Sequence, residues 1–95
     1  MTFDVITTLS GAEVLARAKA FFAERVPNAA AYPEREGPAY LLLRGQGGEE
    51  VAIAVFAAPV GIRVRASTLF FDQPLDRFLS TLPVPASSEQ SSGAE

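Results

Sequence analysis

Arg63 and Arg65 are the residues whose type and spacing could most readily do chemistry in this chain of 95 residues. They lie in the stretch GIRVRAST, where they alternate with Ile62, Val64 and Ala66. Successive side chains of a β-strand point to opposite faces, so this stretch would present one apolar face and one basic face. Two guanidinium groups on one face could bind an anion, anchor a protein partner, or neutralise acids on neighbouring strands.

The sequence lacks the groups on which many catalytic and metal sites depend. It contains neither Cys nor His, which excludes disulfides, thiol chemistry, zinc fingers and Ser-His-Asp triads. Glu49 and Glu50 are adjacent, so in a strand they would point to opposite faces and could not work as a paired acid and base. The glycine-rich stretch 45–48 lacks the Lys-Ser/Thr of a phosphate loop. We therefore expect no enzymatic activity, no cofactor and no metal site.

Composition predicts one small globular domain. Apolar residues make up 48% of the chain, enough for a real core. The net charge of −3 argues against nucleic acid as a partner, because nucleic-acid binders usually carry a basic field. No stretch approaches the ~18 uninterrupted apolar residues of a membrane span, and the start MTFDVITT does not resemble a signal peptide. We expect a cytoplasmic protein.

Hydrophobic periodicity predicts the order strand, helix, four-stranded meander, helix. The strands are predicted over residues 3–9, 29–34, 39–44, 50–56 and 61–68. Pro33 places the second of these strands at a sheet edge. A capping box of Ser10 and Glu13 is expected to start the first helix, and Pro27 to stop it. The second helix is expected to follow a capping Asp72 or Gln73.

The predicted fold class is α+β, a two-layer sandwich in which both helices cover one face of an antiparallel five-stranded sheet. The apolar side chains expected on the covered face are Val5, Leu41, Leu43, Val51, Ile53, Val55, Ile62, Val64 and Ala66, with Phe22 and Phe78 packing on them from the helices. The order of elements resembles a single repeat of the TATA-box-binding-protein type, or half of the helix-grip folds that bind lipids. This resemblance is architectural, and it assigns no binding residue.

The predicted domain spans residues 1–82. Residues 83–95 read PVPASSEQSSGAE, with Val84 as the only large apolar side chain. Such a segment cannot bury enough apolar surface to offset its ordering entropy, so a disordered tail is expected.

The uncovered face of the sheet is the candidate site. Pairing Val55 with Val64 and Leu43 with Val51 aligns the outward side chains in rows across the strands. The residues that this register gathers there are Tyr40, Leu42, Ala52, Ala54, Phe56, Arg63 and Arg65. A solvated sheet face would usually carry polar residues in its middle, whereas this one is apolar or small. Ile6 and Phe71 would enlarge the apolar patch if they border the same face.

Three interpretations of the arginines stay open: neutralisation of Asp4 and Glu50, the rim of a protein interface, and an anion or nucleic-acid site. We expect a non-catalytic binding or assembly module that acts through this face. It would form a homodimer or serve as an accessory subunit of a larger complex. The alternative is a carrier of a small apolar ligand or lipid, held between the helices and the sheet. The residues that would surround that ligand are Phe21, Phe22, Phe70 and Phe78.

The low hydrophobicity of the C-terminal segment predicts that its deletion is harmless. Removal of residues 87–95 should leave the melting temperature unchanged, because these side chains offer no core contacts. Thermal unfolding of the full and the shortened chain measures this. A fall of several degrees on truncation would show that the segment packs on the domain.

Overall fold

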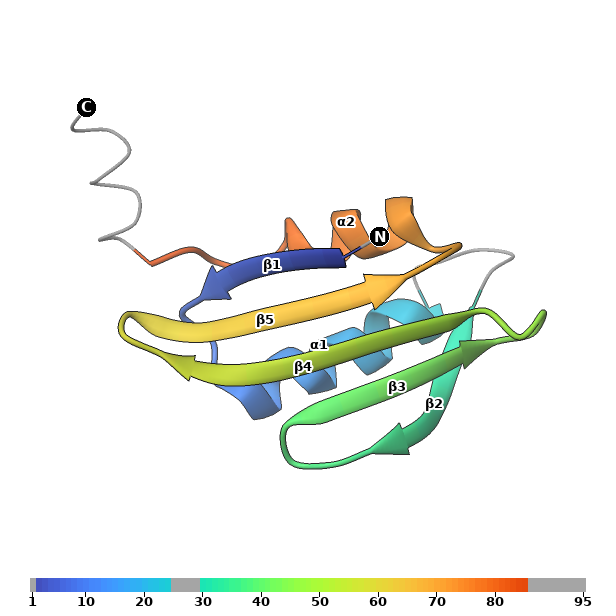
Figure 1. Ribbon diagram of the computed structural model, residues 1–95, viewed down its shortest axis with the longest axis horizontal. Helices are drawn as coiled ribbons and strands as arrows, with labels where there is room; N and C mark the ends of the chain where they lie inside the picture. Colours follow the sequence, from blue (N-terminus) through green and yellow to red (C-terminus); the bar gives the residue numbers. More distant parts are fainter. Residues whose placement is uncertain (1, 25–29, 86–95) are drawn as a thin grey trace.

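A computed structural model describes residues 2–24 and 30–85 and shows one antiparallel five-stranded sheet with two helices. In chain order the elements are β1 (Thr2–Thr7), α1 (Gly11–Glu24), β2 (Ala31–Glu36), β3 (Tyr40–Gly45), β4 (Glu50–Ala58), β5 (Gly61–Thr68) and α2 (Asp72–Leu79). The strands lie side by side in the order β1-β5-β4-β3-β2 (Figure 1). The predicted α+β class and the four-stranded meander are confirmed.

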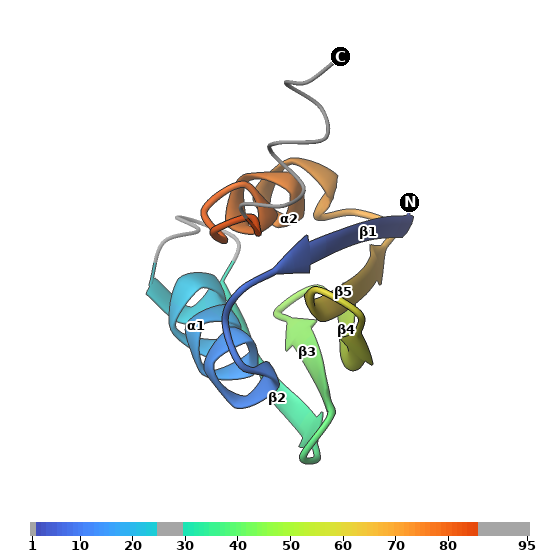
Figure 2. The same ribbon diagram turned by 90° about the vertical axis from the view of Figure 1, so that its left-hand side faces the viewer.

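Both helices lie on the same side of the sheet, which gives the chain two layers (Figure 2). Among the described residues no helix or strand covers the opposite side of the sheet (Figures 1 and 2). We call this uncovered side the outer face, and the side under the helices the inner face. Each strand therefore presents alternate side chains to two different environments.

The core fills the space between the inner face and the helices. In β4, Val51, Ile53 and Val55 are buried. The predicted inner side chains all pack there, although Val5 and Ile62 are only partly buried. From α1 the buried side chains are Val14, Leu15, Ala18, Phe21 and Phe22, a stripe with the spacing of one helix face. Phe78 of α2 completes the covering layer.

The predicted pairing of the central strands is confirmed. Val55 lies opposite Val64, and Leu43 lies opposite Val51. A shift of one residue would have turned these buried side chains outward, so burial of one face selects this register.

Local caps account for the start of α1 but not for the start of α2. The backbone N–H of Glu13 donates to Oγ of Ser10 at 3.2 Å, which confirms the serine half of the predicted capping box. In α2 the N-cap is Phe71, so the prediction of Asp72 or Gln73 as the cap is wrong.

Packing of Phe71 explains where α2 begins. Its ring is 6% exposed and stacks on Phe22 with centroids 6.3 Å apart. Its backbone N–H donates to Oγ1 of Thr68 at 3.2 Å. Phe71 therefore belongs to the core and does not border the outer face as expected, because the chain leaves the sheet plane after Thr68 to reach the helical layer.

The edge strand β2 spans Ala31–Glu36, two residues later than predicted. Pro33 lies on this edge as expected, and the register of β2 against β3 shifts between Pro33 and Arg35. A proline and a bulge both interrupt a regular ladder, and an edge strand tolerates them because one of its sides is unpaired. The expected stop of α1 at Pro27 lies outside the described residues.

The described chain extends to residue 85, three residues past the predicted domain boundary at Leu82. The carbonyl of Pro83 accepts a hydrogen bond from Oγ1 of Thr7 at 2.7 Å and another from the backbone N–H of Thr8 at 3.2 Å. Thr7 is fully buried, so this contact satisfies a buried hydroxyl. The contact ties Pro83 to the end of β1, while residues 86–95 of the predicted tail lie outside the described part.

The central position of Ile53 makes it a sensitive probe of the inner face. Ile53 is 1% exposed, so Ile53→Ala should lower the free energy of unfolding by ~2–5 kcal/mol through lost burial and a residual cavity. Ile53→Val, which removes one methylene, should cost only about 1 kcal/mol. Urea unfolding of the three proteins measures both values. A nearly neutral Ile53→Ala would mean that the two faces have been assigned the wrong way round.

Candidate interaction surface on the outer face

The outer face is organised in four rows of side chains that run across the strands. Arg44 and Glu50 form the first row, Leu42, Ala52 and Ser67 the second, Tyr40, Ala54 and Arg65 the third, and Phe56 and Arg63 the fourth. Strand β1 extends the last three rows, because Thr2 lies opposite Ser67, Asp4 opposite Arg65 and Ile6 opposite Arg63. The register thus brings all seven predicted site residues onto one surface.

A hollow of about 470 Å³ lies over the middle of this face. Its lining includes six of the seven predicted residues, namely Tyr40, Leu42, Ala52, Ala54, Phe56 and Arg65. The hollow exists because small side chains occupy its floor, whereas Tyr40 and Phe56 stand at its margin with exposures of 45% and 49%. Arg63 lines an adjoining hollow of about 330 Å³ together with Ile6 and Phe56.

Arg63 and Arg65 share one carboxylate. Nε of Arg63 lies 3.3 Å from Oδ1 of Asp4, and Nε of Arg65 lies 3.5 Å from Oδ2 of the same residue. The contact follows from the register, since Asp4 is directly opposite Arg65 and diagonal to Arg63. All three side chains are about half exposed, so each pair is worth little to stability. Two guanidinium groups against one carboxylate leave this end of the face basic.

Arg44 organises the opposite end of the face. Its Nε donates to Oε1 of Glu34 at 2.8 Å, its Nη2 donates to Oε2 of Glu50 at 3.2 Å, and its Nη1 donates to the carbonyl of Gly48 at 3.0 Å. The hydrogen bond with Glu34, helped by the charges of both carboxylates, raises the pKa of Arg44 above its usual value. Glu50, which the sequence placed within reach of Arg63 and Arg65, pairs with Arg44.

Leu69 and Phe70 belong to the same surface, although the sequence analysis did not place them there. They follow β5 and are the most exposed large apolar side chains of the described residues, at 79% and 73%. They line a hollow of about 330 Å³ that shares Ala52 and Ser67 with the surface over the sheet. Leu69 continues the alternation that turns Arg63, Arg65 and Ser67 outward. This spacing of two residues is the feature of the sequence that could have placed Leu69 on the outer face.

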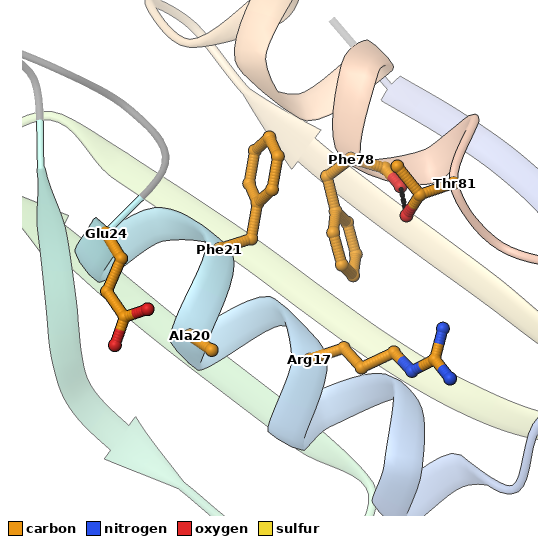
Figure 3. A pocket seen from close by; sticks show the side chains of 6 residues that line it. All are labelled: Arg17, Ala20, Phe21, Glu24, Phe78 and Thr81. Carbon is orange, nitrogen blue, oxygen red and sulfur yellow. Dashed lines mark hydrogen bonds between the residues drawn. The ribbon is translucent and has the colours of Figure 1, made fainter.

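The four phenylalanines expected around an apolar ligand do not enclose a common cavity. Phe21 and Phe78 line an open groove of about 270 Å³ between α1 and α2, beside Arg17 and Glu24 (Figure 3). Their ring centroids are 5.4 Å apart, so the rings pack on each other. Phe22 is fully buried in the core, and Phe70 is exposed at the far side of the sheet.

The chain matches no protein-family model, no curated protein and no solved structure.

Among residues 2–24 and 30–85, neither helix has the length and apolar character needed to cross a membrane. In the same part of the chain, no three carboxylates come together as a group that could hold a metal ion. The outer face is therefore interpreted from its own geometry.

The shared carboxylate predicts a small contribution of the arginine pairs to stability. Asp4→Asn removes the charge with little change of shape, and it should lower the free energy of unfolding by less than ~1 kcal/mol, because the pairs are exposed. Glu13→Gln on α1 breaks a comparably exposed ion pair with Arg17 and serves as the control. Urea unfolding at low and high salt measures both effects. A loss of several kcal/mol for Asp4→Asn alone would show that Arg63 and Arg65 serve mainly to hold β1 on β5.

Proposed function

We propose that this protein is a non-catalytic binding or assembly module that contacts another protein through its outer face. A role as an accessory subunit of a larger complex and a cytoplasmic location are parts of the same proposal. The observation that supports it most directly is the apolar hollow of about 470 Å³ in the middle of a sheet face that has no covering layer among the described residues.

The chemistry of this face suits a protein partner. Its middle is apolar or small, with Leu42, Ala52 and Ala54 half-buried before any partner is bound. Tyr40 and Phe56 stand beside it, and aromatic side chains of this kind are frequent anchors at protein interfaces. The ion-paired groups lie toward the two ends of the strands, around Arg44 at one end and around Asp4 at the other, which matches the usual division into an apolar centre and a polar rim.

In this proposal Arg63 and Arg65 are rim residues. Asp4 already neutralises part of their charge, so a small free anion gains little there, and a nucleic acid would find few cations on an acidic chain. Partly solvated rim charges mainly influence the rate of association and its dependence on salt. Truncation of either arginine should therefore weaken binding less than a change at the centre.

Ala54→Asp tests the proposal at the centre of the face. The new carboxylate would be buried without a partner on association, so binding should be abolished. The free domain should stay folded, because position 54 is only half-buried and lines the hollow rather than the core. Ala16→Asp makes the same change on an exposed position of α1 and serves as the matched control. The measurement compares the proteins retained by each immobilised variant from an extract of the source cells, together with the mass of each variant in solution.

The expected result is that wild type and Ala16→Asp associate with the same protein, or with themselves, and that Ala54→Asp does not. Thermal unfolding must show that all three are folded. Equal association of Ala54→Asp and wild type would overturn the proposal, and so would a wild type that stays monomeric and retains no protein.

A further inference from the structure

We infer that the partner of the outer face is a second copy of this chain, packed face to face with its strands running in the opposite direction. This inference rests on the proposed function, because it names the partner of the same surface. It follows from the unequal charge at the two ends of the face, from the shapes of those ends, and from the area available.

The two ends of the outer face carry opposite charge. The end at the first row holds the carboxylates of Glu34 and Glu50 around the single guanidinium of Arg44. The opposite end, at the third and fourth rows, holds the guanidinium groups of Arg65 and Arg63 around the single carboxylate of Asp4. One face thus has an acidic end and a basic end, and the centre between them is largely apolar, with Arg35 of β2 at its side.

A twofold axis that lies in the interface perpendicular to the strands exchanges these ends. It stacks β4 on β4 of the partner and places the first row of one copy over the fourth row of the other. Glu50 then faces Phe56 of the second copy with Arg63 on the adjacent strand, and this contact occurs twice. An axis parallel to the strands would instead set acid against acid and base against base, which is unfavourable.

The same arrangement matches the shapes of the two ends. Leu69 and Phe70 project at the acidic end, where they are the most exposed large apolar side chains of the described residues. The basic end has a hollow of about 330 Å³ lined mainly by Ile6, Phe56, Ala57 and Pro59. The exchange of ends brings the projecting pair of one copy to the hollow of the other. At the centre, Ala52 lies over Ala54 of the second copy, which lets the sheets approach to the usual spacing of ~10 Å.

The face is large enough for a stable dimer. Four rows of outward side chains on five strands cover a projected area of roughly 600 Å², from a strand spacing of ~4.8 Å and a rise of ~3.4 Å per residue. Side chains project from the sheet, so the accessible area is larger than the projected area. The accessible area of the outer face therefore comes close to the ~800 Å² per partner of a standard protein interface.

A charge exchange between positions 50 and 63 tests this arrangement. Glu50→Arg and Arg63→Glu each set like charges against each other at both symmetric contacts of a homodimer. Each should weaken self-association by roughly tenfold or more at low salt, and by less at high salt. When the two variants are mixed, one contact of the mixed dimer joins the two substituted side chains, which have opposite charge, and the other contact keeps the original pair of Glu50 with Arg63. Association should therefore return.

Neither substitution is expected to unfold the domain. The side chains of Glu50 and Arg63 are both about half exposed. Glu50→Arg leaves the Arg44–Glu34 pair in place, and Arg63→Glu leaves the Arg65–Asp4 pair in place. Arg17→Glu, on an exposed position of α1, is the control and should dimerise as wild type does.

Sedimentation equilibrium over micromolar to near-millimolar concentrations measures the association of wild type, each variant and their equimolar mixture. Wild type should approach twice the chain mass of 10.1 kDa. A wild type that is monomeric at every concentration overturns this inference, and the proposed function would then still stand if the face captures a different protein. If wild type dimerises but the equimolar mixture of Glu50→Arg and Arg63→Glu does not, the antiparallel arrangement is overturned.

Discussion

The alternation of side chains along β4 is the constraint on which the rest of the structure depends. Val51, Ile53 and Val55 are buried on the inner face, while Ala52 and Ala54 between them point outward. Because β4 pairs with both β3 and β5, its phase fixes the phase of its neighbours. A slip of one residue would expose three buried side chains at once, so the arrangement of the outer face is determined by the packing of the opposite side.

The character of the outer face follows from this constraint and from the size of its side chains. Alanines in the middle of β4 leave a hollow that Tyr40 and Phe56 border. The ion-paired residues lie toward the two ends of the outer face, measured along the strands. The ion pairs of Arg44 and Asp4 with their neighbours connect strands at both ends, yet all are exposed and add little to stability. The packing of the inner face against the helices therefore supplies most of the stability.

Sequence periodicity predicted the features that follow from the regular alternation of side chains along the strands. It missed the features that depend on contacts between residues far apart in the chain. The register of Val55 against Val64 followed from alternation. The pairing of β1 with β5 did not, so the sequence placed Asp4 only within reach of the arginines and not directly opposite Arg65. The bounds of β5 were predicted correctly, but the path of the chain after it was not, because alternation cannot show that the ring of Phe71 turns back to stack on Phe22. For the same reason the sequence placed Phe70 with Phe21, Phe22 and Phe78 around an apolar ligand, whereas its side chain is exposed. The carbonyl of Pro83 accepts a hydrogen bond from Thr7, 76 positions away in the chain, a contact that no local pattern records.

The central claim is that the outer face is the surface through which this protein associates. Methyl resonances test it most directly, because the alanine methyl groups of β4 report on the outer face, whereas the methyl groups of Ile53 and of Ala16 on α1 report on the core and on the helical layer. A dilution series by NMR should shift the methyl signals of Ala52, Ala54, Leu42 and Leu69 together, with those of Ile53 and Ala16 unchanged. Concentration-dependent shifts confined to α1 and α2, or signals that do not change at any concentration or with any added partner, would contradict the account.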